Sequence, residues 1–378
     1  MRDITLVPTE IWQDIIVRAC TDGGRTGKSL ALTSKHFHSQ SYDFRFYSIA
    51  LSSLKQLEGF LAFIRALPVA PRLSVHHLWL SFVDDDGPKL DAWEANPNPT
   101  EHKMRASCNA QTRVPRWQAR FLAAINELLP LVAPTLETLS ILQAYRLPLP
   151  RFDLDLPRLR ELTIYNDIAI FTSAHPGSIS SILRLPSLER LHLVTHSAST
   201  RSIFLTASPL RKSPITHLRF SAVEKWDMKT AFPRMLAKAL GLPAPQLSSE
   251  RKATPDSEQP ATVVRAGAAL PHVRELVVHG VGPQPGACPY GEEPWDAVYD
   301  LLEGLVETCG RVKEERIRAH VMERKWRMDS RWRSRLWNDW LSRIEGRQGC
   351  WVQSDDEEAA LEEAVGECAT EIPMWLMY

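Results

Sequence analysis

The chain has 378 residues, of which 44% are hydrophobic and 24% are charged, so it can bury a sizeable core in two or three structural units. Its 45 basic and 45 acidic residues cancel, which argues against a general attraction to nucleic acid or to an anionic membrane. The first ten residues, MRDITLVPTE, contain no apolar run, so we expect no signal peptide. The most apolar later run, 121–139, is interrupted by polar residues and prolines, so we expect no membrane-spanning helix. The sequence favours a cytoplasmic or nuclear protein.

The cysteines and histidines give no sign of a metal or disulfide framework. The six cysteines are scattered without a close pair, which favours free thiols in a reducing compartment. The pairs His36/His38 and His76/His77 lack the spacing that would place both rings on one face of a helix. No nucleophile, acid/base pair or ligand cluster has a convincing spacing, so we expect no catalysis, no cofactor and no metal.

The N-terminal 50 residues predict three short helices. Pro8 suits the first turn of a helix in which Ile11 and Ile15 share an apolar face. A second helical run, with Leu30 and Leu32, follows the turn at 22–24, and a third begins near Ser34 and carries Phe37. Helices this short bury little surface by themselves, so they need the following chain or a partner to hold them.

Residues 4–51 resemble an F-box. The resemblance is carried by Leu6, by Pro8 to Ile11, by Ile15-Ile16, by the block 30–35, by Phe37 and by the strand-like exit 46–51. It implies docking on a Skp-type adaptor and, through that adaptor, on a cullin. The adaptor-facing residues that it implies are Leu6, Pro8, Ile11, Ile15, Leu30, Leu32 and Phe37. The alternative is a small helical cap whose apolar residues point inward onto the first strands.

The segment Asp22 to Ser29, DGGRTGKS, is similar to a phosphate-binding loop but departs from the motif. Asp22 stands where that motif has its first glycine, and the preceding residues predict an amphipathic helix and not a strand. A carboxylate at this position would repel a phosphate. We therefore interpret the segment as a turn between two helices.

A strand pattern recurs through the middle of the chain, most clearly in LPSLERLHL at 185–193. Counted from Leu188, its apolar residues stand at relative positions 1, 4 and 6. A proline precedes the strand and biases the chain to extended structure. The six copies are Val75-Leu78-Leu80, Leu136-Leu139-Ile141, Leu159-Leu162-Ile164, Leu188-Leu191-Leu193, Ile215-Leu218-Phe220 and Val273-Leu276-Val278.

These copies make residues 70–282 similar to an irregular leucine-rich repeat array. Steps of 23, 29 and 27 residues between the middle leucines lie within the usual repeat length, and we interpret the long steps of 61 and 58 as doubled units. The array lacks the asparagine or cysteine that usually follows the last leucine. The expected fold is α/β: a three-helix F-box-like segment (4–51), an uneven repeat solenoid (52–282) and a C-terminal helical cap with an acidic tail (292–378).

In such an array the residues between the leucines line the opposite face of the sheet, usually the concave one. Aromatic and arginine side chains are common anchors of protein interfaces. The expected substrate contacts are Trp79, Tyr165, Arg190, His192 and Arg219. The alternative is that loops or terminal segments cover them.

Two insertions and a helical C-terminus complete the prediction. Residues 84–115 predict a polar loop before a helix from about 116 to 129, and residues 242–266, rich in proline, serine and charge, predict disorder. A helix is expected from Pro294 to about Cys309, followed by a longer one over 312–344 that contains several tryptophans and arginines. That helix could stack on nucleic acid, but helical spacing of its apolar residues favours a packed terminal cap.

Together these patterns predict a non-catalytic substrate receptor of a Skp-cullin-F-box ubiquitin ligase, which bridges the adaptor and a protein substrate of unknown identity. The first alternative is an interaction scaffold of the same fold that is unconnected to ubiquitin. The second, disfavoured by the balanced charge, is a nucleic-acid binder that uses the tryptophan- and arginine-rich helix. No membrane partner is expected.

Overall fold

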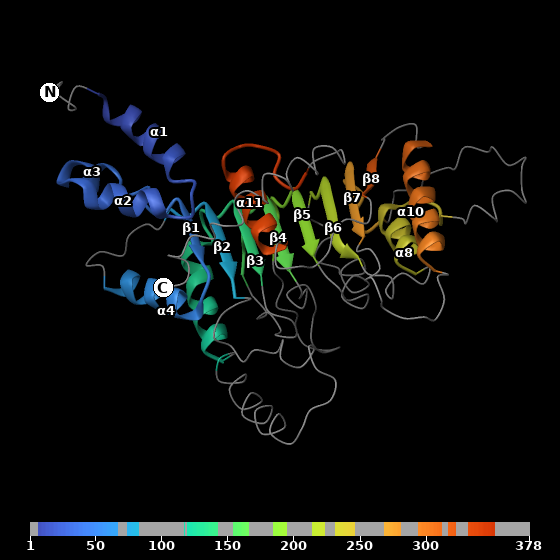
Figure 1. The fold of residues 1–378 in the computed structure, drawn as a ribbon, viewed down its shortest axis with the longest axis horizontal. Coiled ribbons are helices and arrows are strands. Elements are labelled where there is room, and N and C mark those ends of the chain that lie inside the picture. Colours follow the sequence, from blue (N-terminus) through green and yellow to red (C-terminus); the bar gives the residue numbers. More distant parts are fainter. Residues whose placement is uncertain are drawn as a thin grey trace, which may run out of the picture.

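The computed structural model describes residues 7–66, 74–82, 117, 119–142, 154–165, 184–194, 214–223, 231–245, 268–280, 294–311, 317–322 and 332–351. Over these residues the protein is an α/β structure built on one open sheet of eight parallel strands (Figure 1). The strands lie side by side in the order of the sequence, from β1 to β8. All of the predicted loop 84–115, most of the predicted insertion 242–266 and the acidic tail lie outside the described residues.

The sheet contains all six predicted strands and one further strand at each end. The strands are β1 (Ser48–Leu51), β2 (His77–Ser81), β3 (Thr138–Leu142), β4 (Glu161–Tyr165), β5 (Arg190–Val194), β6 (His217–Val223), β7 (Glu275–Gly280) and β8 (Arg318–Met322). The expected strand-like exit after residue 46 is therefore the first strand of the sheet. The 1-4-6 spacing predicted strand positions correctly because each copy places its apolar residues on a common face.

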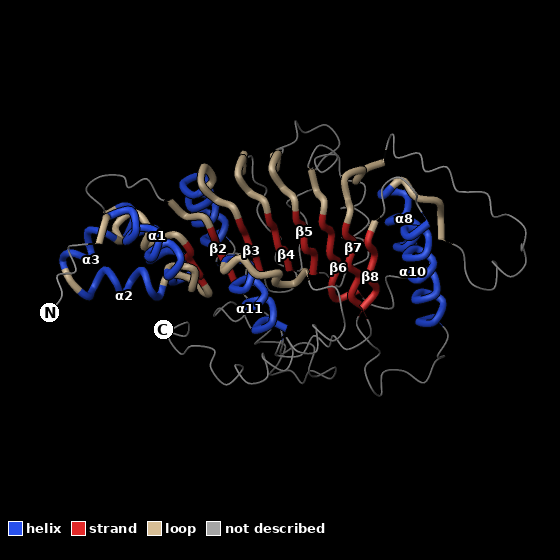
Figure 2. The backbone as a smooth tube through the Cα atoms, turned by 90° about the horizontal axis from the view of Figure 1, so that it is seen from above, coloured by secondary structure: helices blue, strands red, loops and turns tan. Residues whose placement is uncertain are grey.

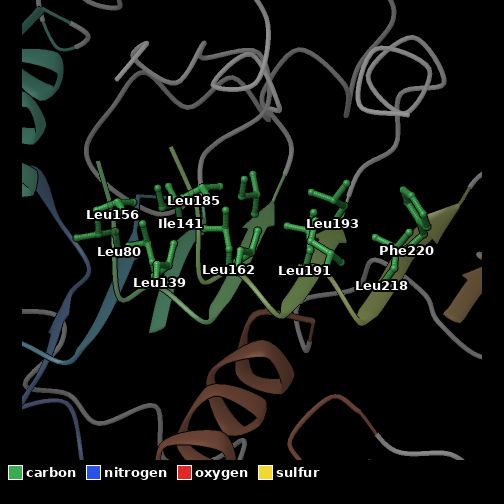
Figure 3. Packing of buried hydrophobic residues seen from close by; sticks show 14 of the residues in the cluster. Leu80, Leu139, Ile141, Leu156, Leu162, Leu185, Leu191, Leu193, Leu218 and Phe220 are labelled. Carbon is green, nitrogen blue, oxygen red and sulfur yellow. The ribbon is translucent and has the colours of Figure 1, made fainter. Parts of the chain in front are cut away.

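The middle leucines of the six copies stand next to one another across the sheet. Each is the register partner of the next, and the stack comprises Leu78, Leu139, Leu162, Leu191, Leu218 and Leu276. Figure 3 shows labelled members of this stack pointing to one side of the strands. All six are at most 3% exposed, and full burial of such a side chain contributes about 1.5–3 kcal/mol. This stack is the centre of the main hydrophobic core.

The two long steps are not doubled units. β2 pairs directly with β3, and β6 pairs directly with β7, so no strand lies between them. Each step is instead one crossover with an inserted helix on the leucine side. Helical residues 119–132 bury Phe121 and Leu128, and α8 (Ala231–Leu240) packs Phe232 edge-on against Phe220, 5.2 Å between ring centroids.

The three expected N-terminal helices lie at the β1 end of the sheet (Figure 1). They are α1 (Thr9–Ala19), α2 (Arg25–Thr33) and α3 (Lys35–Gln40), and β1 and α4 (Leu54–Arg65) follow. Ser34 caps α3, because its side chain accepts the Phe37 N–H at 3.2 Å. Ser53 caps α4 in the same way, accepting the Gln56 N–H at 3.2 Å. α4 was not predicted, although its buried Leu54, Leu57 and Leu61 have helical spacing.

The C-terminal region differs from the prediction of one helix over 312–344. The predicted first helix is present as α10 (Pro294–Arg311), which lies beside β8 at the far end of the sheet. Residues 318–322 then pair with β7 as β8, and the helix α11 (Trp332–Ile344) begins only afterwards. α11 does not cap the end of the sheet. It crosses the face opposite the leucines, as Figure 2 shows.

No helix within the described ranges is long and apolar enough to span a membrane.

Candidate protein-binding surfaces

The N-terminal helices expose large apolar side chains. Ile11 and Ile15 of α1 are each 49% exposed, and Leu32 of α2 is 77% exposed. Ile11 and Ile15 stand one helical turn apart and therefore share a face of α1. Pro8, at the start of α1, is also exposed. We call Pro8, Ile11, Ile15 and Leu32 the N-terminal apolar residues; their exposure is suited to binding a protein.

The other described residues expected to face the adaptor are not exposed in this way. Phe37 of α3 is half-buried and packs edge-on against Trp12, 5.2 Å between ring centroids, so it joins α3 to α1. Leu30 is also half-buried, and Leu6 lies outside the described residues. Only part of the predicted set is thus available on the surface, while part of it holds the three helices together.

Gly23 connects the helices to the sheet. Its N–H donates to the Ser48 hydroxyl at 2.9 Å, and its carbonyl accepts the Ala50 N–H at 3.2 Å. Its φ of +76° belongs to the left-handed region that favours glycine. A Cβ at this position would stand 3.0 Å from the Trp337 ring of α11. Gly23 therefore lies where the helices, the first strand and the C-terminal helix meet.

Three residues of the segment similar to a phosphate-binding loop, Asp22, Gly24 and Gly27, have structural roles. The Asp22 carboxylate accepts the Thr26 N–H at 2.9 Å and the Thr26 hydroxyl at 2.7 Å, so it occupies the N-terminus of α2 itself. Gly24 has a φ of +100°. A Cβ on Gly27 would lie 2.8 Å from the Arg45 Cα, so glycine permits close packing there. These contacts support the interpretation of the segment as a helix-to-helix turn.

The face of the sheet opposite the leucines is covered. Trp79, Tyr165, His192 and Arg219 are 3%, 7%, 1% and 1% exposed. These four expected substrate contacts are not exposed, and the alternative that a terminal segment covers them holds: α11 and residues 345–351 lie over them. Arg190 is half-buried, with its guanidinium 3.7 Å from the Glu189 carboxylate. We call the buried side chains on this face the polar face, and residues 332–351 the C-terminal segment.

The C-terminal segment provides partners for charged groups on the polar face. The Arg343 guanidinium donates to the Glu161 carboxylate at 2.8 Å, and the Trp351 indole donates to the other oxygen of that carboxylate at 3.1 Å. Arg219 donates to the Cys350 carbonyl. Because Glu161 and Arg219 are only 6% and 1% exposed, leaving either charge without these contacts would be costly.

Aromatic packing holds the helix α11 of the same segment against the sheet. Trp79 lies 5.3 Å from Trp337 and 5.7 Å from Trp340 between ring centroids, and Leu336 and Ile344 join the same cluster. The sheet contributes Ala50, Leu142, Tyr165 and Val194 to it. This cluster is separate from the main leucine core. The tryptophans expected to form one packing face do so, but on the sheet face and not at its end.

Two neutral histidines lie in the centre of the polar face. The Arg219 guanidinium donates to the Ser221 hydroxyl at 3.1 Å and lies 3.3 Å from the His279 Nδ1, and Ser221 lies 2.9 Å from the His192 Nε2. Because a guanidinium only donates, the His279 Nδ1 must accept. Burial, and then the charges of Arg219 and Arg335, lower the pKa of both rings well below the usual value. Burial likewise lowers the pKa of His77 to about 3.

A small cavity of about 10 Å³ lies between the sheet and α11, among Glu161, His192, Asp339 and Arg343. It has room for about one water molecule and for no larger ligand. Among the described residues no group of three or more His, Cys, Asp and Glu side chains is placed to hold a metal ion. The described cysteines Cys20, Cys309 and Cys350 are buried free thiols. The interface between the sheet and α11 is therefore a contact between two protein segments.

Sequence reasoning identified much of the polar face but not what covers it. The alternation of the strands placed Trp79, Tyr165, His192 and Arg219 together, as observed. The spacing of Trp337, Trp340 and Ile344 indicated a packing face on α11. Cys350 and Trp351 carried no signal, because their contacts with Arg219 and Glu161 depend on a turn after α11.

Comparison of the chain with protein-family models, with curated proteins and with solved structures finds no match.

Proposed function

We propose that the protein is the substrate-receptor subunit of a Skp-cullin-F-box ubiquitin ligase. In this function α1, α2 and α3 bind a Skp-type adaptor, the adaptor joins the chain to a cullin, and the rest of the protein holds a protein substrate. The chain itself performs no chemistry, because it acts by bringing the substrate to the ligase. The proposal rests on the resemblance of residues 4–51 to an F-box together with the exposure of the N-terminal apolar residues.

The single observation that carries the proposal is the outward position of Ile11 and Ile15. Each is 49% exposed, although a cap that served only to cover the sheet would turn these side chains inward. Burial of a large apolar side chain contributes about 1.5–3 kcal/mol when complete. Covering the exposed parts of Ile11, Ile15 and Leu32 by an adaptor can therefore contribute several kcal/mol before the costs of association.

The nucleic-acid alternative is disfavoured by the positions of the α11 aromatics. Trp340 is 4% exposed, and Trp337 packs against both Trp79 and Trp340. Stacking on bases requires exposed rings. The scaffold alternative differs from our proposal only in lacking adaptor binding, so adaptor binding is the decisive test.

The test is co-purification of the full chain with a Skp-type adaptor. We expect the wild-type chain to retain the adaptor and the variant Ile11→Asp/Ile15→Asp to lose it, because two charges would be buried in the interface. The matched control is Glu10→Gln/Asp14→Asn, which removes two exposed charges of α1 without changing its apolar face. Pro8→Ala combined with Ile11→Asp is expected to behave as the double-aspartate variant does.

Circular dichroism of each variant confirms that the sheet is intact. Failure of the wild-type chain to bind the adaptor would remove the ligase proposal in favour of the scaffold. Adaptor binding that survives Ile11→Asp/Ile15→Asp would show that these residues are not in the interface.

A further inference from the structure

The polar face has the composition of a binding surface and not of a structural core. Its buried side chains include Glu161, His192, Arg219, Glu275 and His279, all at most 6% exposed. Burying charged groups costs free energy unless each finds a partner. The leucine core on the other side of the sheet needs none of them. Tryptophan, tyrosine and arginine are, in contrast, the usual anchors of protein interfaces, and this face has Trp79, Tyr165 and Arg219.

The C-terminal segment contacts this face in the way a bound peptide would. It contributes no strand to the sheet. It makes an aromatic contact through Trp337 and Trp340, an ion pair from Arg343 to Glu161, and a carbonyl contact from Cys350 to Arg219. These contacts belong to a helix followed by a turn, and they occupy a cluster separate from the leucine core. Removing the segment would therefore leave that core in place.

The fit of the segment is incomplete. Within the described residues the Asp339 Oδ2 and the Trp340 Nε1 are buried without a hydrogen-bond partner. The cavity of about 10 Å³ lies beside Asp339 and Trp340. These two atoms therefore add no protein hydrogen bond to the contact between the segment and the sheet. An occupant held in this way is one that a better-matched partner can replace.

We propose that the polar face is the protein's partner-binding surface, that residues 332–351 occupy it in the unbound chain, and that the partner is a protein presenting a basic, aromatic amphipathic helix. Such a helix needs two aromatic side chains three residues apart to pack on Trp79 and an arginine three residues after the second of them to pair with Glu161. A turn after the helix supplies a backbone carbonyl to Arg219. The inference does not depend on adaptor binding, since α1, α2 and α3 play no part in it.

The test uses the full chain and a labelled synthetic peptide of residues 332–351 as the probe, with binding followed by fluorescence anisotropy. In the wild-type chain the tethered segment competes at a high effective concentration, so the peptide binds weakly. The substitutions Trp340→Ala and Arg343→Ala in the chain remove contacts of the tethered segment, and we expect the strands to remain because the leucine core is not altered. We expect this released variant to bind the peptide at least tenfold more tightly than the wild type.

The matched control is a peptide that carries Trp340→Ala and Arg343→Ala, which should not bind the released variant. This control changes only the probe, so it cannot affect the folding of the protein. A released variant that is folded but does not bind the wild-type peptide would overturn the proposal. Equal binding of both peptides would also overturn it, because the recognition would then not depend on the aromatic and arginine contacts.

A released variant that loses its strands would equally overturn the proposal, since α11 would then belong to the core. Hydrogen exchange of the unaltered chain provides a second measurement. We expect the α11 amides to exchange through an opening that leaves the amides of β3, β4 and β5 protected. Exchange of α11 only together with the whole sheet would contradict a replaceable segment.

Discussion

Acidification should destabilise the protein through the neutral histidines of the polar face. His192 and His279 are each 1% exposed, and the pKa of both is lowered by burial and by the charges of Arg219 and Arg335. The unfolded chain therefore binds more protons than the folded chain below about pH 6.5, the ordinary value for histidine. The stability that each neutral ring contributes is present above this pH and is lost progressively as the pH falls.

The loss of unfolding free energy on acidification follows from the linkage between proton binding and folding. For a ring that stays neutral in the folded chain and titrates near pH 6.5 when unfolded, lowering the pH from 7 to 5.5 costs about 1 kcal/mol. The two rings together therefore account for about 2–3 kcal/mol, and His77, whose folded pKa is about 3, adds a similar single contribution. Asp339 has the opposite effect on stability. Burial raises the pKa of its carboxyl group, so protonation in acid removes the free-energy cost of a buried negative charge.

The assay is urea unfolding at pH 7 and pH 5.5, analysed for the wild type and for His192→Gln/His279→Gln. Because other groups also titrate, the comparison is the difference between the two proteins. We expect the double variant to lose about 2 kcal/mol less than the wild type on acidification. Equal losses in the wild type and the double variant would refute the reasoning.

Three further predictions concern the core, the N-terminal turn and the C-terminal segment. Leu191→Ala, at a fully buried position between Leu162 and Leu218, should lower the free energy of unfolding by about 2–5 kcal/mol in urea, and a loss below 1 kcal/mol would contradict its place in the core. Gly27→Ala should reduce the melting temperature markedly more than the exposed Gly59→Ala in α4, because its Cβ would meet the Arg45 backbone; equal melting temperatures would contradict this contact. Cys350 is buried, and burial raises the pKa of its thiol, so alkylation followed by peptide mass spectrometry should be slow in the wild type and at least tenfold faster in the released variant. Equal rates in both would contradict the opening of the segment.

The sequence predicted the centre of the fold well, because the strand pattern has a direct physical cause. A residue at position 4 of each copy must face the core if position 6 does, and the register partners Leu162 and Leu191 follow from that alternation. The three N-terminal helices were found through turn residues and caps, such as Ser34 before α3. These are local signals, readable without knowledge of distant contacts.

The errors occurred where distant contacts decide the structure. Residues 318–322 form a strand because β7 offers an edge and α10 packs beside it, although Ala319 and Val321 are weak strand signals among basic residues. The covered state of Trp79 and Arg219 depends on α11, which lies more than one hundred residues further along the chain. A face pattern shows which side chains point together, but it does not show what packs on them.

The most direct test of the proposed function is calorimetric titration of a purified Skp-type adaptor into the full chain at two temperatures. The account predicts one adaptor per chain and a negative heat-capacity change, because the N-terminal apolar residues would be buried on binding. It also predicts that Ile11→Asp/Ile15→Asp abolishes the heat of binding. Absence of binding by the folded wild-type chain would contradict the proposal that α1, α2 and α3 join this protein to a ubiquitin ligase.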